Sequence, residues 1–270
     1  MKRFLSLGAG VQSSTLALMI ARGELPMVDA AIFADTGDEP QEVYRWLEFL
    51  RNNVPFPIHT VSAGRLSVES TTLRTSKKNG NTYLRSSIPV FITNTNGQRG
   101  MSVRQCTREH KIDPINKLLR KLADVPRGCK EQRVTVLIGI SLDEFRRMKP
   151  SPHKWIKTEW PLIDARMTRQ DCLNWMEANN YPSPPRSACV FCPYKSDAEW
   201  RRLKTDHRAD FLVAVEYEKL LQSSYEQSTA LSGIPFLHAS RVPLGDVDFS
   251  ENASKQVDMF NDECEGMCGV

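Results

Sequence analysis

The sequence lacks any long apolar run. A helix that spans a bilayer needs about 20 consecutive apolar residues, and the longest candidate, residues 14–21, is much shorter. A secretory signal is also missing, because the basic start of the chain leads directly into a strand-like segment at residues 4–7. We therefore expect a cytoplasmic protein that neither crosses a membrane nor is secreted.

The sequence contains seven cysteines, an odd number, so they cannot all pair in disulfides within one chain. Disulfides are uncommon in cytoplasmic proteins, so metal binding or thiol chemistry explains these residues better than disulfide pairing does. Cys172 falls on the apolar face of a predicted helix at 168–179 and is expected to belong to the core.

The chain as a whole has little excess charge of either sign, because its formal net charge is only +4. Residues 65–133, however, contain 15 Lys or Arg against 5 Asp or Glu, so the rest of the chain has a net charge of −6. A basic segment of this kind could follow a nucleic-acid backbone. It holds only two aromatic residues, Tyr83 and Phe91, so the sequence does not predict base stacking there.

Short apolar runs alternate with helical patterns through the first half of the chain. This alternation predicts an α/β protein with a doubly wound, Rossmann-like parallel sheet. The predicted strands are 4–7, 29–34, 57–61 and 134–138, and the predicted helices are 11–22, 40–53, 112–123, 168–179 and 196–221. We expect an α/β domain over 1–165, with a basic insertion or mobile flap at about 62–103, and a helical and irregular C-terminal region over 166–270.

A glycine-containing loop, LSLGAGVQSS at residues 5–14, lies between the first strand and the first helix. Backbone N–H groups at such a turn, together with the helix dipole, favour an anion. The loop has no lysine after its glycines and no third glycine, so it fits neither the Walker nor the dinucleotide motif. The candidate ligands are Ser6, Gly8, Gly10, Gln12, Ser13 and Ser14.

Two other predicted strands end in small or polar residues. Asp35, Thr36 and Gly37 follow the second strand, and Gly139 follows the fourth, where the missing side chain would let a ligand approach the backbone. Open α/β sheets bind ligands at the carboxyl ends of their strands. These residues therefore complete a predicted nucleotide crevice.

The chain resembles the PP-loop adenine-nucleotide α-hydrolase superfamily, and within it the phosphoadenylylsulfate (PAPS) reductase family, including phage-type and DndC-like members. The residues that carry the resemblance are the 5–14 loop, FADTG at 33–37 with Glu42 and Tyr44, Gly139, WPLID at 160–164, and Cys189 with Cys192. The resemblance implies a fold of the adenine-nucleotide α-hydrolase type. It also implies that the loop binds the phosphate or sulfate of PAPS, or of ATP with Mg²⁺. Gln12 and Ser13 stand where ATP-cleaving members carry an acidic residue, which favours a reductase-like loop.

Cys189 and Cys192 form a C-x-x-C pair, whose spacing suits zinc, an iron–sulfur cluster or a redox dithiol. Cys106 precedes the pair by 82 intervening residues. Similarity to adenylylsulfate reductases implies that these three cysteines hold a [4Fe–4S] cluster, with zinc as the alternative. Gln105 replaces a further cysteine of that pattern, so the fourth position would be open to a sulfur atom or filled by Cys129, Cys264 or Cys268.

The last residues, DECEGMCG, resemble the C-terminal segment that carries the nucleophilic cysteine of PAPS reductases. This makes Cys264 and Cys268 candidate nucleophiles, regenerated by a thioredoxin-like reductant. Their acidic neighbours would raise the thiol pKa unless a cation offsets them. The alternatives are a second half-site for a metal ion and a disordered end.

Two cations complete the predicted site. The resemblance assigns Lys111 and Arg146 to catalysis, where fixed positive charge would bind the nucleotide and stabilise a departing anion. The leading prediction is a PAPS reductase-like enzyme that transfers or reduces sulfur. One alternative is an ATP-dependent, pyrophosphate-releasing enzyme that inserts sulfur into, or adenylates, tRNA or DNA. Another is a non-catalytic nucleotide- and metal-binding regulator. A homo-oligomer is compatible with each of the three.

Overall fold

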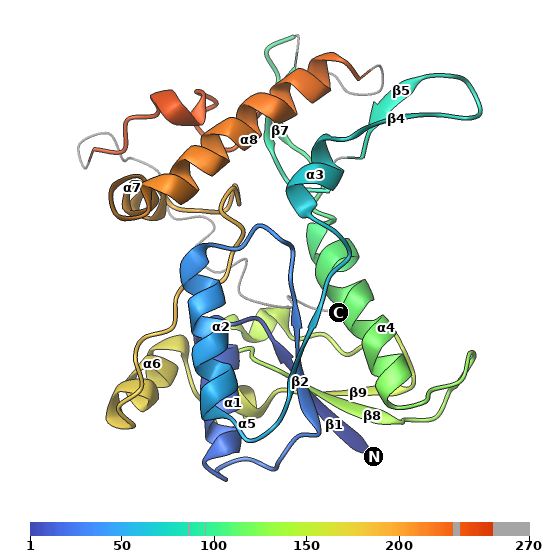
Figure 1. Ribbon diagram of the computed structural model, residues 1–270, viewed down its shortest axis with the longest axis vertical. Coiled ribbons are helices and arrows are strands. Elements are labelled where there is room, and N and C mark those ends of the chain that lie inside the picture. Colours follow the sequence, from blue (N-terminus) through green and yellow to red (C-terminus); the bar gives the residue numbers. More distant parts are fainter. Residues whose placement is uncertain (86, 95, 229–232, 251–270) are drawn as a thin grey trace.

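The computed structural model describes residues 1–85, 87–94, 96–228 and 233–250, and its centre is a five-stranded parallel sheet (Figure 1). The strands are β1 (Lys2–Leu7), β2 (Ala30–Ala34), β3 (Ile58–Val61), β8 (Val134–Ile138) and β9 (Ile156–Glu159). Their order is β3-β2-β1-β8-β9. The connections run in opposite directions from β1, so the strand order reverses between β1 and β8, and this reversal is where open sheets bind ligands.

Helices cover both faces of the sheet, as nearly continuous apolar strands require. One face packs against α1 (Val11–Ala21), α2 (Gln41–Asn53), α5 (Pro161–Asp164) and α6 (Arg169–Ala178). The other face packs against α4 (Asp113–Leu122). The predicted fold class, an α/β doubly wound parallel sheet, is confirmed.

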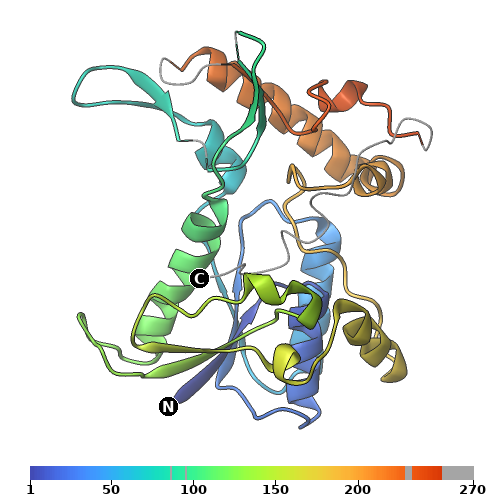
Figure 2. The same cartoon turned by 180° about the vertical axis from the view of Figure 1, so that it is seen from behind.

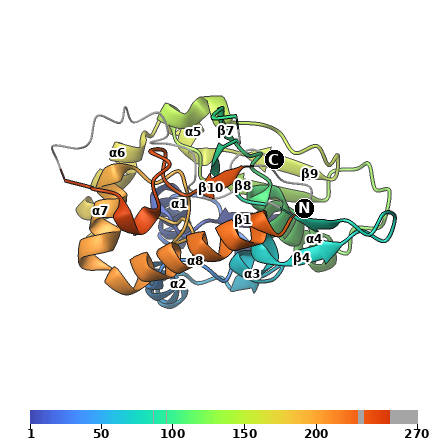
Figure 3. The same ribbon diagram turned by 90° about the horizontal axis from the view of Figure 1, so that it is seen from above.

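A second core lies beyond the carboxyl ends of the strands, as Figures 2 and 3 show from behind and from above. Two stretches that are far apart in sequence build it. The first contributes α3 (Leu66–Thr71), β4 (Leu73–Thr75), β5 (Thr82–Leu84), β6 (Phe91–Thr93) and β7 (Arg99–Met101). The second contributes α7 (Asp197–Asp206), α8 (Arg208–Glu226) and β10 (Ile234–Phe236). β10 pairs with β6, so the two stretches share a sheet.

The described residues of the predicted insertion or flap at 62–103 form a short helix and three-residue strands, most of which pack into the second core. That the segment is an insertion stays a prediction. The predicted helix at 196–221 is in fact α7 and α8, which meet at His207. The predicted boundary near residue 165 stays a prediction. The cores themselves extend across it, because α6 packs on the sheet whereas Leu66 and Ile88 pack with the C-terminal helices.

The expectation that Cys172 belongs to the core is confirmed. Cys172 is fully buried in the core beside the sheet. Thr168 caps α6 through a reciprocal pair of hydrogen bonds with Asp171. Within the described ranges, no helix combines the length and the apolar character needed to cross a bilayer.

Candidate active site

The loop between β1 and α1 has the geometry of an anion site. Ala9 adopts a left-handed backbone conformation with φ of 60°, which turns the chain sharply between the two glycines. Gly10 caps α1 without a side-chain hydrogen bond. The Ser13 hydroxyl accepts the N–H of Gly8 at 3.1 Å and so closes the loop on itself. No side chain caps the first N–H groups of this 11-residue helix. These groups begin the helix at the predicted crevice, where they suit an anion.

Two of the predicted loop ligands are used within the protein. Ser14 is fully buried, and its hydroxyl accepts the indole N–H of Trp46 at 2.8 Å. The Gln12 amide lies 3.3 Å from both the Ser141 hydroxyl and the Glu144 carboxylate. These contacts fix α1 against α2 and against the segment that follows β8. In this arrangement both side chains hold the loop in place.

Gly139 has a different role from the one that the sequence suggested. A Cβ atom at this position would lie 2.8 Å from the backbone N of Ser13. The space beside Gly139 is therefore filled by the start of α1, and the missing side chain lets this helix approach β8. The structure thus shows a packing role for Gly139, and its contact with a ligand stays a prediction.

The turn after β2 holds the second set of predicted ligands. The Asp35 carboxylate accepts the N–H of Gly37 and the Tyr44 hydroxyl, each at 2.8 Å. Gly37 has φ of 75°, which glycine adopts without strain. Burial, followed by the bond to Asp35, raises the pKa of Tyr44, so this phenol keeps its proton. Thr36, between the two, is buried and lines a pocket.

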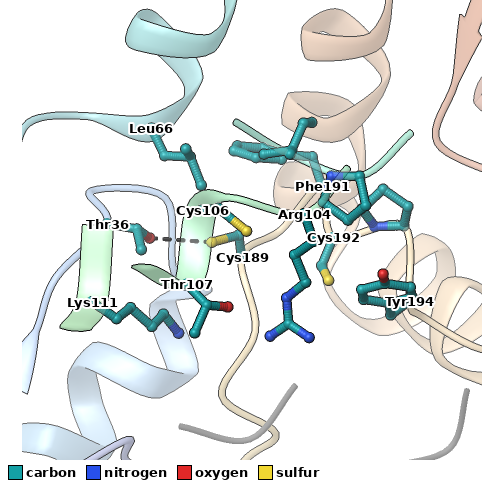
Figure 4. A pocket seen from close by; sticks show the side chains of 13 residues that line it. Thr36, Leu66, Arg104, Cys106, Thr107, Lys111, Cys189, Phe191, Cys192 and Tyr194 are labelled. Carbon is teal, nitrogen blue, oxygen red and sulfur yellow. Dashed lines mark hydrogen bonds between the residues drawn. The ribbon is translucent and has the colours of Figure 1, made fainter. Parts of the chain in front are cut away.

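This pocket brings the three predicted metal ligands together (Figure 4). It encloses about 430 Å³, part of which is open to solvent. Cys106 enters just ahead of a π-helical turn at Thr107–Ile112, which leads into α4. Cys189 and Cys192 enter from the loop between α6 and α7. Two segments that are distant in sequence therefore meet at one cavity beside the end of β2.

Cys189 links the pocket to the sheet. Its Sγ lies 3.2 Å from the Thr36 Oγ1, in hydrogen-bond contact. Burial raises the pKa of the Cys189 thiol well above its usual range, and the charge of Glu39 adds to this effect. Lys111 and Thr36 lower the same pKa in part. The thiol is therefore protonated at neutral pH, and cations close to it favour its ionisation.

The structure brings Lys111 to the site but not Arg146. Lys111 is buried, lines the pocket, and has its Nζ 3.5 Å from the Glu39 Oε1. Arg146 lies in the exposed 3₁₀ segment at Leu142–Arg147, with its guanidinium 6.0 Å from the Phe145 ring. It is not among the residues that line this pocket.

Arg104 and Tyr194, which the predicted site did not include, complete the pocket wall, and Lys195 lies next to Tyr194 in sequence. The Arg104 guanidinium lies in the pocket, 5.5 Å from the centre of the Tyr194 ring. Lys195 donates to the Cys189 carbonyl at 3.0 Å, and burial lowers its pKa. The run of basic residues around Cys106 was the signal for Arg104, but nothing in the sequence placed the ring of Tyr194 beside it.

The three cysteines share one pocket, but no arranged metal site is evident among the described residues. One zinc ion needs three or four donors around a common point, and no three His, Cys, Asp or Glu side chains of the described ranges are arranged in that way. The thiolates of an iron–sulfur cluster bind separate iron atoms, so they surround a larger volume. Three cysteines around one cavity match that chemistry in donor type and are one short of the usual four thiolates.

The predicted fourth ligands lie elsewhere or outside the described residues. Cys129 follows α4, packs against the core beneath the sheet, and has its Sγ 3.4 Å from the Glu131 carbonyl. It does not line the cysteine pocket. Cys264 and Cys268 lie outside the residues that the structure describes.

Comparison with known proteins gives one kind of match. No family model matches the sequence, and no curated protein does. Among solved structures, the chain is similar to the PAPS reductase from Candida auris in its phosphate complex, with a TM-score of 0.42 and 13% sequence identity. That similarity covers 68% of this chain and 75% of the reductase chain.

Proposed function

We propose that the protein is an enzyme that binds an adenine nucleotide at the loop before α1 and performs sulfur transfer or reduction at the cysteine pocket. One observation carries the proposal. The contact between Thr36 and Cys189 joins the end of β2, which is part of the crevice, to the thiols. A sulfur atom on a nucleotide held at the strand ends would therefore meet cysteine side chains directly.

The nucleotide half of the proposal rests on the loop and the turn. The uncapped N-terminus of α1 offers N–H donors to a phosphate or sulfate group. At the neighbouring strand end, the hydrogen bond from the Gly37 N–H to Asp35 fixes the turn that would face the nucleotide, and Arg65 fills the space beside Gly37. The loop itself has no carboxylate for Mg²⁺, because Gln12 and Ser13 stand where ATP-cleaving members carry an acid, and the Gln12 amide contacts Ser141 and Glu144. This favours PAPS over Mg-ATP.

The sulfur half rests on the pocket. Cys106, Cys189 and Cys192 would hold a [4Fe–4S] cluster, which when bound supplies an iron position open to a sulfur atom. Lys111 and Arg104 place positive charge beside the thiols, where it would bind the sulfate or phosphate end of a substrate and stabilise the anion that departs. The cluster, the nucleotide and the chemical step belong to the proposal together.

Anaerobic purification of the full chain tests the metal part. We expect iron and acid-labile sulfide in the wild type and their loss in Cys106→Ser and in Cys189→Ser. Cys129→Ser is the matched control and should keep both. A protein that carries zinc without sulfide, or a cluster that survives Cys189→Ser, would contradict this assignment.

Nucleotide binding and turnover test the rest. PAPS should raise the melting temperature of the protein, because a ligand that binds the folded state stabilises it. With a thioredoxin-like reductant, PAPS should yield sulfite. Release of pyrophosphate from ATP that depends on added tRNA or DNA would instead identify the ATP-dependent alternative. If neither nucleotide shifts the melting temperature, both enzymatic proposals fail.

A further inference from the structure

The hairpin formed by β4 and β5 is anchored at its base in the second core and projects from it (Figure 1). It carries an excess of positive charge. Figures 1 and 2 show it as an arm that projects beyond α3. Residues 72–85 contain Arg74, Lys77, Lys78 and Arg85 and no acidic residue. The two lysines lie at the exposed tip, and neither pairs with an acid among the residues described. Arg85, at the base, is held by Glu109.

The arm has little structural purpose of its own. Its two strands pair only with each other, over three residues on each side. Such an isolated hairpin is marginally stable in water, and Leu84, which packs into the second core, anchors it. A protruding element that presents cations and contributes one buried side chain is typical of a surface that meets a partner.

One face of the hairpin also carries an aromatic ring. Arg74 lies directly opposite Tyr83 in the antiparallel register, so the two side chains share a face of the ribbon. Tyr83 is exposed. A phenol ring beside a guanidinium provides a platform on which an unpaired base can stack, while the lysines at the tip contact phosphates. An acidic polypeptide would use the cations but not the ring.

The same stretch of chain continues from the arm into the wall of the thiol pocket. Leu66, before the hairpin, and Ile88, after it, both line the pocket. Arg108, two residues after Cys106, has a side chain that is 82% exposed and lies 3.9 Å from the Asp113 carboxylate. The chain on both sides of the hairpin therefore reaches the pocket, and Arg108 adds an exposed guanidinium close to it in sequence.

We propose that the β4–β5 hairpin, together with Arg108, is a docking surface for a folded RNA that presents an unpaired base. The proposal stands on the charge and geometry of the hairpin and is independent of the function proposed above. RNA fits better than duplex DNA because its loops present bases already unstacked. A base in duplex DNA would first have to be flipped out of the stack.

Binding of a fluorescently labelled RNA stem-loop to the full chain, without nucleotide, tests the surface. The variant Lys77→Glu/Lys78→Glu should weaken binding roughly tenfold or more at about 0.1 M salt and reduce the slope of log K against log salt by about 2. Tyr83→Ala should weaken binding severalfold without changing that slope. Lys154→Glu/Arg208→Glu is the control, because it makes the same charge change at exposed positions outside the arm.

The proposal fails if the control weakens binding as much as the tip variant does. It fails equally if duplex DNA of the same length, or polyglutamate, binds as tightly as the RNA. An unchanged melting temperature of each variant excludes unfolding as the cause of any loss. RNA binding is measured without nucleotide, so a failure here does not affect the outcome of the nucleotide and iron measurements. Equally, a protein that fails those measurements could still bind RNA.

Discussion

The Oγ1 of Thr36 and the Sγ of Cys189 lie 3.2 Å apart, although 152 residues separate them in sequence. Thr36 lies in the turn after β2, and Cys189 packs against the second core. Their contact is where the proposed nucleotide crevice and the thiol pocket meet. It therefore gives the most direct experimental access to the candidate site.

Replacing Thr36 with Val should make Cys189 less reactive. The hydrogen bond from Thr36 lowers the pKa of this thiol against the larger opposing effect of burial. Its loss should slow alkylation of Cys189 at fixed pH by roughly fivefold, as expected for one hydrogen bond of about 1 kcal/mol. Mass spectrometry of the alkylated peptide measures the rate. Thr107→Val, in the same pocket, should leave it unchanged, and an equal effect of both variants would contradict the prediction.

Replacing Gly139 with Ala should destabilise the protein. The new Cβ would lie 2.8 Å from the backbone of Ser13, so the start of α1 must move. We expect a loss of about 1–3 kcal/mol in the free energy of unfolding, together with weaker nucleotide binding. Gly100→Ala is the matched control, because nothing lies within 4 Å of the added atom. Unfolding in urea measures both variants, and equal stability of the two would show that α1 does not need the close approach.

Replacing Ser14 with Ala should affect stability more than ligand binding. It leaves the buried indole N–H of Trp46 without its acceptor, which costs about 1–3 kcal/mol. Nucleotide affinity, measured by calorimetry, should change by less than about threefold, because about 0.6 kcal/mol corresponds to that ratio. Loss of nucleotide binding with unchanged stability would show instead that the Ser14 hydroxyl contacts the ligand.

Glu218 should make the stability depend on pH. This buried acid in α8 accepts the N–H groups of Leu237 and Leu244 at 2.7 and 2.6 Å, and burial raises its pKa above 4.5. The folded protein therefore holds this proton more tightly than the unfolded chain does. Its contribution to stability is full below the unfolded pKa and is lost as the pH rises through the folded value.

Glu218→Gln removes this titration. Relative to the variant, the wild type should lose stability as the pH rises above about 4.5. Urea unfolding across that range measures the difference. Glu226→Gln, at an exposed position of the same helix, is the control. A constant difference between wild type and Glu218→Gln at every pH would contradict the prediction.

The parts of the fold that could be predicted are those in which the chain repeats one simple pattern. The strand VTVLI at 134–138 is apolar apart from Thr135 because both of its faces are covered, and its bounds match the structure. The edge strand β9 was not predicted, since IKTE has a single buried residue. The three-residue strands of the second core are too short to show an alternation.

The candidate site was only partly predictable for a similar reason. The C-x-x-C spacing and the glycine loop are local patterns, whereas the meeting of Cys106 with Cys189 depends on how two distant segments fold together. The resemblance to a family suggested that Cys106 and Cys189 lie close together, whereas their spacing in the sequence could not show this. The contact of Thr36 with a thiol, and the filling of the space at Gly139, are tertiary facts without a local signal.

The wide turn at Thr107–Ile112 determines the direction in which Cys106 points. Each residue of an α-helix advances the chain by about 100° around the axis, and a π-helical turn holds one residue more than an α-helical turn. Deleting one residue there would leave Ile115 and Leu119 in the core but rotate Cys106 away from Cys189 by about that angle. Chain length in this single turn, as much as the identity of the cysteine, decides whether Cys106 lines the same pocket as Cys189.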